Sequence, residues 1–156
     1  HEGKCFVGSR SNWKSEGNNS WWYAFRNISA IEIFIRKNPD IILFGEVFGG
    51  NNQDIKYDRN FTDFRAFDAK KLYGDFIEQE ELQLLCEESG VECVPELYRG
   101  VFDLEHLQNL AEEPSALYNG GKEGLVIKTV EEKYKGKLGR TQAKYISKWY
   151  FLRKEK

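Results

Sequence analysis

The sequence contains no methionine, only three prolines and no long apolar run. A complete translation product begins with methionine, so the start at His1 leads us to expect that an N-terminal part of the natural protein precedes it. No apolar stretch approaches the roughly 20 residues of a membrane-spanning helix, and the first residues lack the pattern of a signal peptide. These absences predict a soluble, intracellular protein with no membrane partner.

Cysteine is also scarce, and the charge of the chain is nearly balanced. Cys5, Cys86 and Cys93 lack the CxxC spacing of a zinc or redox site, so we expect reduced thiols and a cytoplasmic location. The net charge is only −2, but residues 128–156 hold ten basic against three acidic residues. This C-terminal stretch is a candidate phosphate-binding surface, with a lysine-rich tail that merely aids solubility as the alternative.

The hydrophobic pattern predicts one globular domain of mixed secondary structure. Helices are predicted over residues 18–38, 78–89 and 103–112, and strands over residues 4–10, 41–48, 63–70, 91–98, 123–130 and 143–151. Asn19 or Ser20 is expected to cap the first helix, and residues 133–139 to form a turn. Because helices and strands do not alternate regularly, the pattern indicates an α+β fold with antiparallel sheets.

Two strand segments carry side chains that a purely structural strand would not favour. Glu46 is the one carboxylate in an apolar and glycine-rich segment, where a buried unpaired charge would cost several kcal/mol, so we expect a ligand or a buried donor beside it. In residues 63–68, alternation puts Phe64 and Ala66 on one face and Arg65 and Phe67 on the other. Either an aromatic ring lines a cleft there or both rings pack in the core.

Two further segments place charge next to apolar strands in the C-terminal half. Glu123 and a glycine stand at the start of an apolar strand. Lys144 lies within a strand pattern and shares a face with Ile146, so that face is not uniformly polar. A solvated amine on an edge strand is the alternative reading of Lys144.

In this order, the segments resemble the motifs of the nucleotidyltransferase domain shared by ATP-dependent RNA ligases, DNA ligases and mRNA capping enzymes. They are most similar to those of phage-type RNA ligases. Residues 44–50 resemble the third motif, 63–68 the aromatic motif, 123–128 the fourth, 144–150 the fifth, and 8–10 the arginine motif. The resemblance covers essentially the whole chain. It implies one nucleotidyltransferase domain over residues 1–156, with antiparallel sheets flanked by helices and an ATP pocket between the sheets.

The resemblance also implies a role for each motif residue. Phe64 would stack on adenine, and Glu46 would accept the ribose hydroxyls. Arg10 and Lys144 would bind phosphate and act in catalysis. Glu123 would face the ribose and phosphate and hold a divalent ion, so ATP and Mg²⁺ are the implied cofactors.

The family reaction begins when a lysine in a Lys-x-(Asp/Glu/His)-Gly motif attacks the α-phosphate of ATP. Residues 14–17, Lys-Ser-Glu-Gly, fit that pattern, but they follow the arginine motif instead of preceding it. We therefore interpret Lys14 as a loop lysine before a helix. The nucleophile is expected upstream of His1, so this chain alone should not adenylylate itself.

By this resemblance the parent protein is an ATP-dependent RNA ligase. A phage or a virus is among the expected sources. It would join RNA 5′-phosphate and 3′-hydroxyl ends through lysyl-AMP and adenylylated-RNA intermediates. A DNA ligase is the close alternative, because the ATP pocket is shared and only contacts to the 2′-hydroxyl distinguish the two substrates. A homologue without a nucleophile, which only binds nucleotide or nucleic acid, is the other alternative. Nothing in the sequence indicates an oligomeric state.

Overall fold

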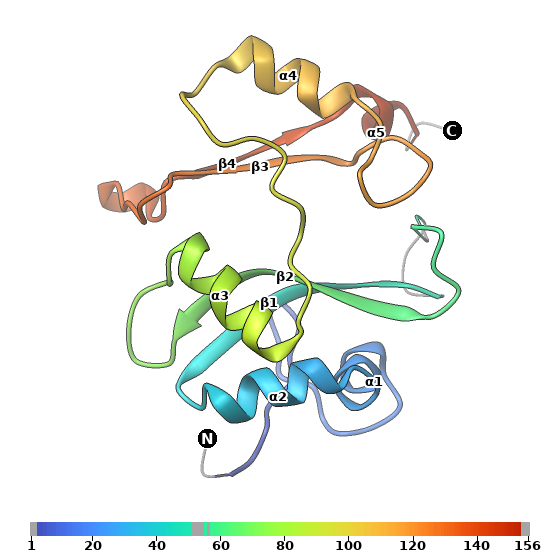
Figure 1. Cartoon of the computed structure of the whole chain (residues 1–156), viewed down its shortest axis with the longest axis vertical. Coiled ribbons are helices and arrows are strands. Elements are labelled where there is room, and N and C mark those ends of the chain that lie inside the picture. Colours follow the sequence, from blue (N-terminus) through green and yellow to red (C-terminus); the bar gives the residue numbers. More distant parts are fainter. Residues whose placement is uncertain (1–2, 51–54, 56, 154–156) are drawn as a thin grey trace. The chain divides into compact units, whose positions relative to one another are not determined.

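The computed structural model describes residues 3–50, 55 and 57–153 (Figure 1). The chain forms two compact units, His1–Val94 and Pro95–Lys156. The first unit contains α1 (Ser20–Asn27), α2 (Ser29–Lys37), β1 (Ile41–Gly49), β2 (Thr62–Lys71) and α3 (Gln79–Ser89). The second contains α4 (Leu104–Glu112), β3 (Gly124–Lys128), the short 3-10 helix η1 (Gly136–Leu138), β4 (Gln142–Ile146) and α5 (Lys148–Arg153). Each unit thus has one two-stranded antiparallel sheet, which confirms the predicted α+β class.

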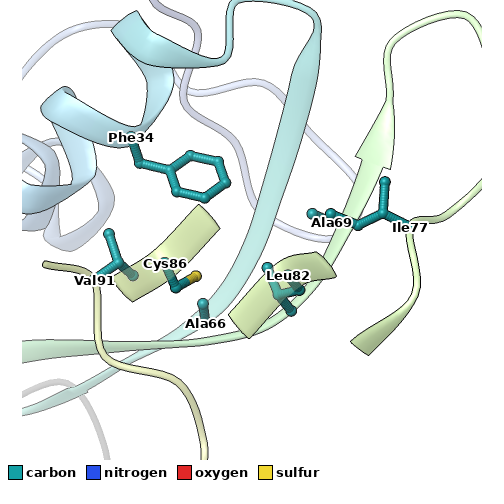
Figure 2. Close-up of a cluster of buried hydrophobic side chains, with 7 residues drawn as sticks. All are labelled: Phe34, Ala66, Ala69, Ile77, Leu82, Cys86 and Val91. Carbon is teal, nitrogen blue, oxygen red and sulfur yellow. The ribbon is translucent and has the colours of Figure 1, made fainter. Parts of the chain in front are cut away.

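In the first unit, one face of the β1–β2 sheet packs against helices. A buried cluster joins α2 and α3 to this face and also includes Ile77 and Val91 (Figure 2). Phe34 comes from α2, Leu82 and Cys86 come from α3, and Ala66 and Ala69 come from β2. We call this side of the sheet the core face.

The opposite side of the same sheet carries both charged and aromatic residues, with Phe44 and Phe48 on either side of Glu46 along β1. Glu46 pairs across the sheet with Arg65, so both side chains project from this side, which we call the Glu46 face. The register shifts between Phe44 and Gly45, because Phe44 pairs with Asp68 whereas Gly45 pairs with Ala66. This shift is a β-bulge, which places one extra residue in β2 at this point.

In the second unit, α4 covers one face of the β3–β4 sheet. Leu107 and Ala111 of α4 pack against Leu125, and Ile127 and Tyr145 join this small core. On the other side of the sheet, Val126 lies opposite Lys144, next to Ile146. We call this second side the Lys144 face.

The predicted helix over residues 18–38 is two helices, which meet at Ile28. Ile28 has φ −108° and ψ 88°, outside the helical region, although its N–H still bonds to the Ala24 carbonyl at 2.9 Å. The apolar spacing continues through this break, so periodicity alone does not reveal it. Asn19 is the N-cap, as expected, and its side chain accepts a hydrogen bond from the Trp22 N–H at 3.1 Å.

Two predicted strands are wrong and form only isolated bridges. In residues 4–10, Gly8 pairs with Trp13 across a tight turn. In residues 91–98, Cys93 pairs with Ala66 in a parallel bridge, in which the Ala66 N–H donates to the Glu92 carbonyl at 2.9 Å and the Val94 N–H donates to the Ala66 carbonyl at 2.8 Å.

The predicted strand over residues 143–151 is also too long. It ends at Ile146, and α5 begins directly after Ser147. The Ser147 hydroxyl accepts a hydrogen bond from the Tyr150 N–H at 3.1 Å, the pattern of a helix N-cap. No helix in the described part of the chain is long and apolar enough to cross a membrane.

Candidate functional site

Glu46 lies on β1 with an exposed side chain, beside a fixed positive charge. Its cross-strand partner Arg65 is 16% exposed, forms an ion pair with Glu92 and donates to the Cys93 carbonyl at 3.5 Å. The Glu46 side chain is itself exposed, and the largely buried Arg65 lies opposite it; a ligand for Glu46 stays a prediction. An exposed carboxylate next to a largely buried guanidinium can accept hydrogen bonds from the hydroxyl groups of a ligand.

Phe64 lies on the core face, opposite Val47. Its ring covers Gly45 so closely that a Cβ atom at position 45 would overlap the ring, and it packs against the buried cluster of Figure 2. Glu46 and Phe64 thus lie on opposite faces of one sheet, and the structure does not bring them together. The stacking role of Phe64 stays a prediction, because a ring in this position has a packing role as well.

Phe67 lies at the β-bulge, between Ala66, which pairs with Gly45, and Asp68, which pairs with Phe44. It is half-buried, and it is not one of the side chains that pack against the core cluster. The bulge interrupts the regular alternation of side chains at this point of β2, between the core residues Ala66 and Ala69. The sheet therefore offers Phe67 as a second candidate for stacking on a base.

The Lys14 segment is fixed to α1. The Lys14 ammonium lies 4.6 Å from the centroid of the Trp21 ring, and the Lys14 carbonyl accepts a hydrogen bond from the Trp22 indole N–H at 2.9 Å. Glu16 forms a 2.7 Å ion pair with Arg26. These contacts give the Lys-Ser-Glu-Gly segment a structural role, in agreement with its interpretation as a loop before a helix.

Arg10 lies in the exposed turn that precedes this segment. The turn is closed by a hydrogen bond from the Ser9 N–H to the Asn12 carbonyl at 2.8 Å. Among the candidate residues, Arg10, Glu46 and Phe64 belong to the first unit, and Glu123 and Lys144 belong to the second.

In the second unit, Glu123 is half-buried and directly precedes β3. The next residue, Gly124, has φ +152°, and a Cβ atom there would overlap the carbonyl oxygen of Tyr145. Only glycine tolerates both conditions. The backbone next to the Glu123 carboxylate is therefore held in one conformation.

Lys144 is exposed on β4 and projects from the side of the sheet that α4 does not cover. Its cross-strand partner Val126 is 63% exposed, and Ile146 is 49% exposed on the same side. The expected position of Lys144 beside an apolar residue is confirmed. Lys148, which the sequence pattern put on the same strand face, lies in α5 instead.

The described residues include no group of three or more His, Cys, Asp or Glu side chains that could hold a metal ion. Glu123 is a single carboxylate. Mg²⁺ is commonly bound through one or two carboxylates, with substrate phosphates and water as its other ligands. Glu123 fits this mode of binding, in which most ligands come from the substrate and solvent.

A cavity of about 430 Å³ lies in the first unit. It is lined by Arg65, Gln83, Cys86, Glu87, Val91, Glu92 and Cys93. A hydrogen bond between the Cys86 and Cys93 thiols, together with burial, raises the pKa of Cys86, so its thiol stays protonated. Two carboxylates in the lining also disfavour a triphosphate. This cavity does not match the predicted nucleotide chemistry.

The fold is that of an α+β protein with small antiparallel sheets. Residues 2–146 match the family model for RNA ligase. The chain belongs to the RNA ligase family, which confirms the resemblance seen in the sequence motifs. No curated protein sequence matches the chain.

The chain is also similar to solved structures of the RNA ligase of Naegleria gruberi. A variant with ATP and Mn has a TM-score of 0.76 and 23% identity over 96% of this chain and 48% of that chain. The ligase with PPi has a TM-score of 0.74 and 23% identity over 97% and 48%. A variant with AMP and Mn has a TM-score of 0.75 and 22% identity over 95% and 47%. These structures share the fold, and the chain spans about half of their length.

Proposed function

We propose that this chain is part of an ATP-dependent RNA ligase that joins RNA 5′-phosphate and 3′-hydroxyl ends. The reaction proceeds through lysyl-AMP and adenylylated RNA. The family match over residues 2–146 carries the proposal. The solved structures with ATP, AMP or PPi support it, because these are the nucleotide reactant and the products of such a reaction.

We propose that the Glu46 carboxylate accepts hydrogen bonds from the ribose hydroxyls of ATP. The carboxylate is exposed on the Glu46 face, and the neighbouring Arg65 side chain is held by Glu92 and the Cys93 carbonyl. A carboxylate offers two oxygen atoms that accept hydrogen bonds from hydroxyl groups. The base requires an aromatic partner; Phe64 is the one predicted from the motif, and Phe67 is a second candidate because Phe64 also packs against the core cluster.

We propose that Lys144 and Arg10 bind phosphate groups. Lys144 projects from a strand face that also carries exposed Val126 and Ile146, and an amine beside apolar groups interacts more strongly with a phosphate than one surrounded by water. It would neutralise the charge that develops as pyrophosphate or AMP leaves, a role that commonly lowers the barrier by a few kcal/mol. Arg10 is exposed in a closed turn and can reach a phosphate without moving the core.

We propose that Glu123 helps to hold Mg²⁺. When bound, the ion supplies a positive charge that polarises the phosphate oxygens. The residue itself contributes one half-buried carboxylate on a backbone that Gly124 fixes.

The test is a nick-sealing assay with the full-length parent protein on matched RNA and DNA substrates. The proposal predicts sealing of RNA that requires ATP and a divalent ion and is lost in Lys144→Ala. Lys133→Ala is the matched control, because Lys133 is an exposed lysine of the same unit. Preferential sealing of DNA would favour the DNA ligase alternative, and nucleotide binding without sealing would favour a binding homologue.

A further inference from the structure

Lys122 is a buried lysine directly before Glu123. Its side chain is 8% exposed, and burial of an ammonium group is costly unless hydrogen bonds compensate for lost water. Its Nζ donates to the Leu110 carbonyl at 2.5 Å and lies 3.7 Å from the Glu113 carboxylate. The Leu110 carbonyl is one of the last four of α4, which lack partners within the helix. Lys122 therefore ties the C-terminal end of α4 to the segment that carries Glu123.

Ser147 fixes the same segment from the other side. It is fully buried, and its hydroxyl donates to the Lys122 carbonyl at 2.5 Å. Its backbone N–H donates to the Glu123 carbonyl at 3.0 Å. The two carbonyl groups next to the Glu123 side chain are thus both bonded to one buried residue between β4 and α5.

The two helices of this unit are linked at the same place. The Lys148 N–H, at the start of α5, donates to the Glu112 carboxylate at 2.8 Å. With the Gly124 conformation, these bonds hold the Glu123 backbone from α4, β4 and α5. A ligand-binding carboxylate must be held within about 0.5 Å of its productive position, and such support commonly comes from the residues behind it.

We propose that Lys122 and Ser147 are positioning residues that orient the Glu123 carboxylate toward its divalent ion. The inference rests on the proposed function, in which Glu123 binds that ion together with ATP phosphates. Lys122 and Ser147 do not touch the ion. Outer residues of this kind commonly change metal affinity by about 10- to 100-fold when they are replaced.

The test compares Lys122→Met and Ser147→Ala in the full-length protein. Met keeps most of the volume of the Lys122 side chain without the ammonium, and Lys133→Met is the control at an exposed lysine. Mn²⁺ binding is measured by EPR of the free ion with a non-hydrolysable ATP analogue, and thermal unfolding is recorded without Mn²⁺. We expect both test variants to weaken Mn²⁺ binding by about 10-fold or more, the control to leave it unchanged, and Lys122→Arg to restore part of the loss.

Glu123→Ala separates this inference from the proposed function. If Glu123→Ala weakens Mn²⁺ binding while folded Lys122→Met and Ser147→Ala bind as the wild type does, the positioning role is wrong and the metal role stands. If Lys122→Met or Ser147→Ala lowers the unfolding temperature but leaves the Mn²⁺ affinity unchanged, the residue supports the fold only and the positioning role is likewise wrong. If Glu123→Ala itself leaves Mn²⁺ binding unchanged, the metal role of Glu123 is wrong and the inference fails with it. If Lys122→Met does not fold, the Mn²⁺ affinity of Ser147→Ala alone tests the positioning role.

Discussion

The two phenylalanines of β2 should respond differently to truncation, because they lie in different surroundings. Phe64 packs on the core face and covers Gly45, whereas Phe67 lies at the bulge and is not one of the side chains packed against the core cluster. Replacing a buried Phe by Ala costs about 3–5 kcal/mol, and half-buried Phe64 should lose about 2–3 kcal/mol. For a protein of this size, such a loss lowers the midpoint of thermal unfolding by about 5–10 °C.

Phe67→Ala should instead act on the use of ATP. A lost base stack of about 1–3 kcal/mol raises the KM for ATP by about 5- to 150-fold, with little change in the unfolding midpoint. Both variants are made in the full-length protein, with unfolding followed by circular dichroism and KM measured from lysyl-AMP formation. If Phe64→Ala raises KM without changing the midpoint while Phe67→Ala has no effect, the assignment of the sheet faces is refuted.

Three further predictions follow from individual residues. Lys144→Ala should abolish adenylylation and sealing. Lys154→Ala and Lys156→Ala, at positions outside the described residues, should change only the dependence of activity on salt. Equally small effects of all three substitutions would mean that Lys144 only aids solubility. The present chain should form no covalent adenylate with α-labelled ATP and Mg²⁺, and label that is retained after denaturation but lost in Lys14→Ala would show that Lys14 is a nucleophile. The raised pKa of Cys86, due to its hydrogen bond with Cys93 and to burial, should protect it from iodoacetamide at mildly alkaline pH until the protein unfolds; rapid alkylation of the native protein would contradict this.

Elements with strong local signals could be predicted from the sequence. Asn19 caps the first helix, Gly90 ends α3, and Asp103 caps α4 by accepting from the His106 N–H at 3.0 Å. Each of these signals acts through neighbouring residues and needs no distant partner. The two long strands of the first unit are also near their expected positions, because their apolar runs are bounded by polar segments.

Features that depend on distant partners could not be predicted. The bulge at Gly45 shifts the register of β1 against β2, and strand alternation alone does not show where pairing slips. The motif resemblance predicts Phe64 as the stacking residue, whereas its packing against the core cluster required the structure. The break at Ile28 and the start of α5 after Ser147 are local, but the apolar pattern continues through both, so periodicity does not show them.

The supporting residues of Glu123 illustrate the same limit. Lys122 stands next to a motif glutamate, but only the folded structure shows that it is buried against Leu110. Ser147 follows a strand pattern, and its bond to the Lys122 carbonyl spans 25 residues of sequence. The charged groups of the candidate site could be predicted from the sequence, whereas the groups that hold them in place are seen only in the folded structure.

The most direct test follows the α-phosphate of labelled ATP through one turnover of the full-length protein. We predict that the label appears first on a lysine of the protein, then on the 5′-phosphate of an RNA strand, and leaves as AMP when the strand is sealed. Both transfers should be absent in Lys144→Ala. A protein that never becomes labelled, or that transfers label to DNA but not to RNA, would contradict the assignment as an ATP-dependent RNA ligase.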